Sequence, residues 1–245
     1  MIRSYRAFAG MAAFGAIWLG LSGSVAGAQG RIQDLQIGLH ASELPTEGFF
    51  RFACGSNGGT PLQPLEGWEN FGACAADGMG LHEVYVELDD ELTVLGRLFR
   101  ERFDEPFPLR HLAGTRIAGH PVIFSVLFDA EGYIQGTRAV TDSRAETDER
   151  RAGYMFGHRM VNQFDPGRWE CEDLPLADGE QPVGESRYIK TRCETVYRDE
   201  SRMRVYYHFL RKPGQRPIDA QGNYLDGQWD SMARWEVFSL SVAVD

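Results

Sequence analysis

The chain of 245 residues carries 25 basic and 35 acidic side chains, which gives a net charge of −10 at pH 7. Because an acidic protein gains nothing from a phosphate backbone, this charge excludes nucleic acid and disfavours anionic lipid surfaces as partners. The length suits one large domain or two small ones.

The first 28 residues have the three-part order of a cleavable secretory signal peptide. Arg3 and Arg6 supply a positive start, residues 8–21 are apolar, and residues 26–28 form a small-x-small cleavage site. The alternative is an uncleaved anchor, but about 14 apolar residues fall short of the roughly 20 that a membrane-spanning helix requires. We therefore predict cleavage after Ala28, no membrane span afterwards, and a periplasmic or secreted protein. The mature part keeps 23 basic against 35 acidic residues, a net charge of −12.

The four cysteines are Cys54, Cys74, Cys171 and Cys193. An even number in an exported chain suggests two disulfides, although four cysteines permit three connectivities. We favour the sequence neighbours, Cys54–Cys74 and Cys171–Cys193, each closing a loop worth roughly 3 kcal/mol in the chain-entropy model. A metal site made of all four thiolates would require CxxC-type spacing, which the sequence lacks.

Along the chain, residues 29–80 are rich in turn formers and predict a loop-dominated region clipped by a disulfide. Trp68 and Phe71 are expected to pack against the core and hold this region on it. The next segment, 81–88, alternates apolar and charged residues, which indicates a half-buried strand. Apolar residues near helical spacing then predict a helix over 91–103, which the following prolines end.

Residues 120–129 are apolar on both faces, which predicts a central strand, and they join 133–141 in a hairpin. Ser143 and Glu146 have the spacing of a capping box, which predicts a helix from there to Phe164. Three β-prone runs follow, at roughly 187–198, 202–211 and 229–244.

These elements predict a single α+β domain over residues 29–245, in which one main helix covers an antiparallel sheet. Residues 29–110 are expected to form its loop-rich N-terminal part, with a strand and a helix. Residues 111–245 are expected to hold the core of sheet and helix.

One family resemblance comes from three stretches: PVIFSVLFDAEGYIQGTRAVTDS, a helix running into FDP, and GEQPVGESRYIKTRC. Their order over residues 115–198, about a third of the chain, resembles the C-terminal domain of TonB-type proteins. That family keeps an N-terminal membrane anchor and a proline-rich spacer, and this chain has neither, so energy transduction is not carried over. The resemblance implies a β-β-α-β unit that makes contacts in the cell envelope, for example through a sheet edge.

The densest group of candidate catalytic or cation-binding side chains is acidic. Paired carboxylates can divide acid and base roles when their environments separate their pKa values. The preferred interpretation is structural, since strand alternation explains the two glutamates as a solvated face, and the aspartates as a turn or helix start. The residues of this acidic cluster are His82, Glu83, Glu87, Asp89 and Asp90, with Glu91 beside them.

Other chemistry has no sequence support. The six histidines lack zinc-binding spacing, and no G-x-S-x-G elbow, phosphate-binding loop or dinucleotide fingerprint occurs in the mature part. The sequence therefore predicts no metal, no cofactor and no catalytic residue.

Aromatic and arginine side chains interleave near the C-terminus. Tyr, Trp and Arg are the usual anchors of protein interfaces, although they are also ordinary occupants of a sheet face. The candidate binding residues are Tyr188, Arg192, Tyr197, Arg204, Tyr206, Trp229 and Trp235.

The leading expectation is an exported, non-catalytic module that binds another envelope protein. The alternative is a periplasmic hydrolase, or a binder of a small ligand or cation, that uses the acidic cluster. A third class, a secreted structural subunit, would self-assemble at micromolar concentration.

Overall fold

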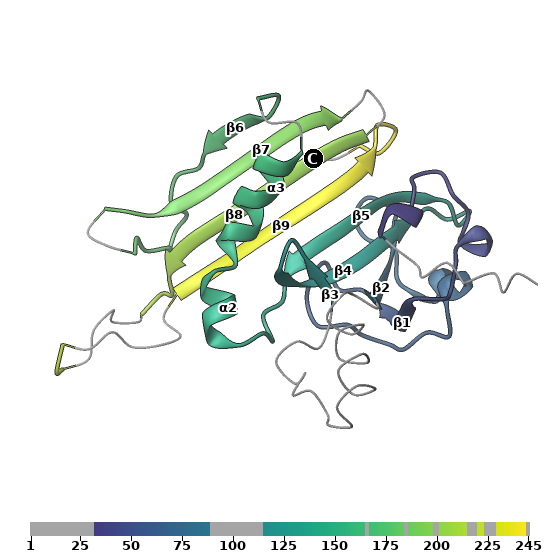
Figure 1. Cartoon of the computed structure of the whole chain (residues 1–245), viewed down its shortest axis with the longest axis horizontal. Coiled ribbons are helices and arrows are strands. Elements are labelled where there is room, and N and C mark those ends of the chain that lie inside the picture. The colour runs from purple at the N-terminus through teal and green to yellow at the C-terminus, as the bar shows by residue number, and fades with distance from the viewer. Residues whose placement is uncertain are drawn as a thin grey trace, which may run out of the picture.

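The computed structural model describes residues 32–88, 115–164, 167–183, 186–197, 201–214, 220–222 and 229–243 (Figure 1). Its strands form one antiparallel sheet of nine strands, in the order β1-β2-β4-β5-β9-β8-β7-β6, with β3 paired to β4 off this path. Helices are few and short, so the described part of the chain is mainly β with some helix.

The six predicted strands are confirmed, although the last of them ends at Ser239 and not at 244. Three further short strands, over residues 49–54, 115–117 and 170–173, were not among these predictions. The first half of the sheet holds β1 (Phe49–Cys54), β2 (His82–Leu88), β3 (Thr115–Ile117), β4 (His120–Phe128) and β5 (Ile134–Thr141). The second half holds β6 (Glu170–Asp173), β7 (Ile189–Tyr197), β8 (Ser201–Arg211) and β9 (Trp229–Ser239). The strand predicted from apolar residues on both faces, β4, is buried along almost its whole length.

The predicted helix from Ser143 to Phe164 is wrong in its start and in its continuity. Two helices occupy this stretch, α2 (Thr147–Arg151) and α3 (Tyr154–Gln163), and Glu146 makes no side-chain cap for α2. The predicted capping box does not form because Asp142 takes over the turn, accepting the backbone N–H of Arg144 at 2.8 Å. A capping box does occur at His40 and Glu43, at the short 3-10 helix Ala41–Glu43.

One face of the sheet, here called the helix face, packs against α3. Its side chains include Phe124, Ala139, Val205 and Trp235, which the register places side by side across four strands. α3 adds buried apolar side chains to the same core, and it contacts β8 and β9 most (Figure 1). Gly157 of α3 is essential to this packing, since a Cβ there would lie 2.6–2.8 Å from ring and Cβ atoms of Tyr207.

The N-terminal loop region packs over β1 and β2, as predicted. Trp68, in the 3-10 helix Trp68–Ala73, is 2% exposed, and its Nε1 donates to the carbonyl of Pro45 at 2.9 Å. Phe71 stacks on Phe128 of β4 at 5.4 Å. A further 3-10 turn, Ile32–Asp34, precedes this region.

Both predicted disulfides are present, Cys54–Cys74 and Cys171–Cys193. Among the described residues, no helix is long and apolar enough to cross a membrane. The predicted signal peptide over residues 1–28 and the predicted helix over 91–103 lie outside the described residues.

Replacing Gly157 with Ala tests the contact between α3 and the sheet. The added methyl group would overlap Tyr207, which costs about 1–3 kcal/mol, while the higher helix propensity of Ala returns up to about 1 kcal/mol. We expect the free energy of unfolding, measured in urea, to fall by about 1–2 kcal/mol. Gly72→Ala is the control, because nothing lies within 4 Å of a Cβ at Gly72, and a loss there of equal size would contradict the assignment.

Candidate functional site

The two outer edges of the sheet differ in how their main-chain groups are used. At the β1 edge, Cys54 N–H donates to Gln63, and the N–H groups of Leu62 and Leu65 donate back to β1. The loop 62–65 therefore acts as a cover for this edge. The other edge is β6, which pairs with β7 alone among the described strands.

The register tells which groups of β6 point outward. Cys171 lies directly opposite Cys193, with Cα atoms 4.0 Å apart, the close spacing of a non-hydrogen-bonded antiparallel pair. Directly after the last residue of that ladder, the Leu174 N–H donates to the carbonyl of Lys190 at 2.8 Å, which fixes the alternation. Residues 170, 172 and 174 therefore bond to β7, and the N–H and C=O groups of Cys171 and Asp173 point away from the sheet.

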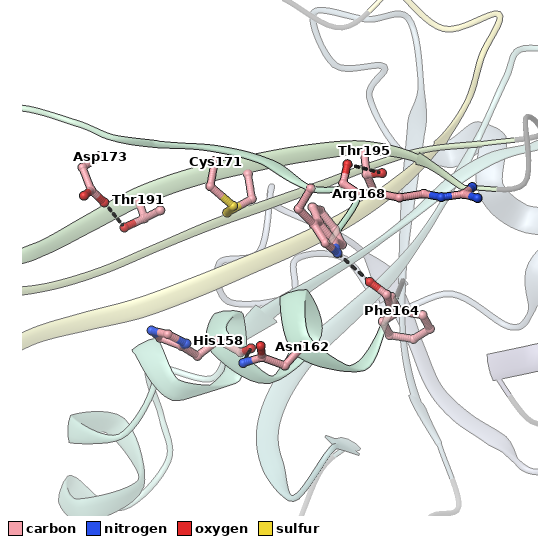
Figure 2. The surroundings of a disulfide bond; sticks show 10 residues. His158, Asn162, Phe164, Arg168, Cys171, Asp173, Thr191 and Thr195 are labelled. Carbon is pink, nitrogen blue, oxygen red and sulfur yellow. Dashed lines mark hydrogen bonds between the residues drawn. A yellow bond between two sulfur atoms is a disulfide. The ribbon is translucent and has the colours of Figure 1, made fainter. Parts of the chain in front are cut away.

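Side chains hold this short strand in place. Figure 2 shows the Cys171–Cys193 disulfide on the side of the sheet where His158 and Asn162 of α3 lie. The Thr191 hydroxyl donates to Asp173 at 2.9 Å, and β6 thereby covers Thr191 and Cys193, which are 8% and 0% exposed. All four residues of β6 are themselves exposed.

The predicted acidic cluster does not converge on one site. β2 divides it: His82 lies on the helix face, where its Nδ1 is 2.6 Å from the carbonyl oxygen of Cys74, while Glu83 and Glu87 lie on the opposite face. Asp89 and Asp90 lie outside the described residues. The expectation that the two glutamates form a solvated face is wrong, because each is only 5% exposed.

The two glutamates are buried because charged and polar partners meet them. Glu83 accepts from Arg138 at 2.8 Å and from the backbone N–H of Asn57 at 2.8 Å. Glu87 accepts from the Tyr85 hydroxyl at 2.7 Å and lies 3.5 Å from Arg51. Burial raises the pKa of Tyr85 to about 12; Arg144 opposes this rise and Glu87 adds to it. The partners of both carboxylates lie within the sheet and the loop that covers it, so these contacts join β2 to its neighbours.

Arg138 of β5 is the residue of this face that the sequence analysis missed. Its guanidinium is 3% exposed and binds Glu83 of β2 at 2.8 Å and Glu236 of β9 at 2.6 Å. The one signal in the sequence is an arginine within the predicted strand 133–141. Arg234 extends the network, since it lies 3.2 Å from Glu236 and donates to the side chain of Asn57 at 2.7 Å.

The candidate aromatic and arginine residues do not form one surface. Tyr197, Trp229 and Trp235 lie on the helix face, where Trp235 stacks on Phe164 at 5.3 Å. The remaining strand residues of the set, Arg192, Arg204 and Tyr206, lie on the opposite face, as their pairing with Glu172, Glu236 and Arg234 requires. Tyr188 is 38% exposed and precedes β7.

On this opposite face, Tyr206, His208 and Asp230 form a short polar chain. Nδ1 of His208 lies 3.1 Å from the Tyr206 hydroxyl, and Nε2 lies 3.3 Å from Oδ1 of Asp230. The contact with His208 lowers the pKa of Asp230, against the opposing effect of burial. Burial raises the pKa of Tyr206 above its ordinary value, and the nearby carboxylates of Glu180 and Asp230 add to this rise.

A pocket of about 190 Å³ opens where β5 ends and β9 begins. Asp142, Glu149 and Asp230 contribute acids to its lining, Arg150 and Lys212 contribute bases, and Trp229 adds an aromatic wall. All three acids are already engaged, Asp142 by Arg144 at 2.7 Å, Glu149 by Arg116 and Asp230 by His208. Within the described ranges, no three His, Cys, Asp or Glu side chains come together in a way that could hold a metal ion.

No protein-family model, no curated protein and no solved structure matches this chain. Among the described strands, the main-chain groups on the outer side of β6 have no strand partner.

Replacing Arg138 with Met tests the buried network. The change leaves Glu83 and Glu236 buried without their cation, and breaking a buried ion pair on one side costs about 3–5 kcal/mol. We expect a loss of this size in the free energy of unfolding measured in urea. Arg192→Met is the control, because Arg192 and Glu172 are 49% and 61% exposed and an exposed pair contributes about 0–1 kcal/mol. Equal losses in both variants would show that Arg138 has no special role.

The pair His208–Asp230 generates a prediction about pH. Because the pKa of Asp230 is lowered in the folded state, its contribution to stability is present above the unfolded value of about 3.8 and is lost as pH falls through the folded value. We expect the wild type to lose more stability than Asp230→Asn when urea unfolding is repeated from about pH 5 downward. The exposed Asp178→Asn is the control and should follow the wild type; parallel curves for wild type and Asp230→Asn would refute the assignment.

Proposed function

We propose that the protein is an exported, non-catalytic binding module of the bacterial cell envelope, which recruits another envelope protein by pairing an extended segment with β6. The proposal includes a single α+β domain over residues 29–245, with α3 as its main covering helix. The observation that carries it is the outward direction of the Cys171 and Asp173 main-chain groups. Strand addition to an open sheet edge is a common way for proteins to bind extended peptides.

The contrast between the two edges supports this proposal. Unpaired edges invite unwanted pairing, so proteins usually cover them. This chain covers β1 with residues 62–65 and, among its described residues, places no strand over β6. The two disulfides agree with an oxidising compartment, where such bonds persist.

The strength of the contact follows from the number of groups. Cys171 and Asp173 offer four outward main-chain groups, each worth about 0.5–1.5 kcal/mol net when bonded. Together they supply about 2–6 kcal/mol, which corresponds to a reversible contact with a Kd between tens of millimolar and tens of micromolar. Side chains of the partner must therefore provide the selectivity.

Photocrosslinking in intact cells tests the proposal. A photoreactive side chain at position 172, which is 61% exposed, is expected to give one dominant adduct with an envelope protein, identified by mass spectrometry. The control is the same side chain at position 62, which is 64% exposed near the β1 edge and should not give that adduct.

A pair of substitutions at Asp173 separates main-chain pairing from other effects. Asp173→Pro removes an outward N–H and leaves the main-chain bonds to β7 intact, because proline is tolerated where a strand N–H faces outward; it also removes the carboxylate that Thr191 binds. Asp173→Ala loses the same carboxylate and keeps the N–H. We expect the adduct from position 172 to disappear in Asp173→Pro and to persist in Asp173→Ala. An adduct that survives the proline, or no adduct at all from position 172, would overturn the proposal.

A further inference from the structure

The partner segment has a chemistry that the side chains of β6 specify. We infer that β6 binds an extended polypeptide segment with Lys or Arg at alternate positions and small apolar residues between them. This inference rests on the proposed function and names the class of partner for the same edge.

The sheet contains one unfavourable pair of like charges at β6. Glu170 lies directly opposite Glu194 on the face away from α3, and like charges in this position repel each other. Glu194 is bound by Arg204 at 2.7 Å, so the arginine on its inner side is already engaged. A cation arriving from the outer side of β6 would lie beside Glu170 and relieve the repulsion.

Glu172, the next acid on this face of β6, also has room for a cation. Glu172 also points to the face away from α3, where Arg192 lies 3.4 Å from it. The Glu172 side chain is still 61% exposed, and water reaches it from the outer side of the strand. A strand added to β6 would place its side chains opposite Glu170 and Glu172 on this same face, two residues apart. Both positions favour Lys or Arg.

The Cys171–Cys193 disulfide determines which residue type suits the position between the two basic ones. Opposite Cys171, the side chain of an added strand points to the helix face, beside the Cys171–Cys193 disulfide (Figure 2). A charged side chain gains nothing from a disulfide, whereas a small apolar one packs on its sulfur atoms. The expected pattern is therefore basic, apolar, basic.

A second copy of this chain does not fit the edge. Antiparallel pairing of two β6 strands would bring Glu170, Glu172 and Asp173 of one copy against the same acids of the other, and like charges across a strand pair are destabilising. The net negative charge of the chain adds long-range repulsion between copies. The edge therefore favours a foreign, basic segment.

Peptide binding to the mature protein with both disulfides intact tests this inference. The probes are a short alternating Arg-Val peptide, its Glu-Val counterpart, and the Arg-Val peptide with N-methyl groups along one edge. We expect the Arg-Val peptide to bind, as measured by fluorescence anisotropy, and the Glu-Val peptide to bind at least about tenfold more weakly. N-methylation of the edge that faces β6 should abolish binding, and so should Asp173→Pro.

A matched pair of charge variants locates the effect. Glu170→Gln is expected to lower the affinity for the Arg-Val peptide by about three- to fivefold, which is the contribution of an exposed ion pair. Glu131→Gln removes the same charge from the exposed turn between β4 and β5 and should leave the affinity unchanged. Equal affinity for both peptides, equal effects of the two variants, or insensitivity to N-methylation would each overturn the inference.

The results separate this inference from the function on which it rests. If position 172 crosslinks a partner in cells, and Asp173→Pro removes the adduct, the edge is a binding site whatever the peptides do. Failure of the Arg-Val peptide in that case rejects only the basic pattern. Loss of both signals rejects the binding edge itself.

Discussion

The continuity of the sheet depends on one buried arginine. β5 and β9 are the strands at which the N-terminal half of the sheet meets the C-terminal half, and Arg138 binds Glu83 on one side and Glu236 on the other. The Arg138 side chain can extend across β4 to Glu83 of β2 because Ser125, the residue opposite Arg138 on β4, is small. Arg138 cannot lose one of its two buried glutamates without leaving a buried charge unpaired, so its contacts keep the two halves of the sheet in one register.

Much of the fold could be predicted because it follows from local patterns. The strand at β2, the two-sided apolar character of β4 and the turn before β5 follow from patterns in consecutive residues, and the structure confirms each of them. The predicted half-burial of β2 is wrong, because its charged face is buried as well. The disulfide pairing was predictable too, since neighbouring cysteines close short loops at low entropic cost. Trp68, expected to hold the loop region on the core, is 2% exposed and confirms that expectation.

The candidate site was harder to predict because it depends on residues far apart in the chain. Glu83 looks like a solvated residue until Arg138, which lies 55 positions away, is placed beside it. The acidic β6 has poor strand propensity and forms through Cys193 and Thr191 of its neighbour. Tyr206 and Trp235 belong to one aromatic-rich stretch of the sequence, but they lie on opposite faces of the sheet, because successive residues of a strand point to opposite faces.

The Cys171–Cys193 bond also ties the state of the edge to the place where the chain resides. Four residue pairs join β6 to β7, and a strand of this length holds weakly without a covalent link. In a reducing environment the cysteines would remain thiols, and β6 would lose its covalent link to β7. Oxidation of this one cysteine pair therefore decides how firmly the outermost strand of the sheet is held.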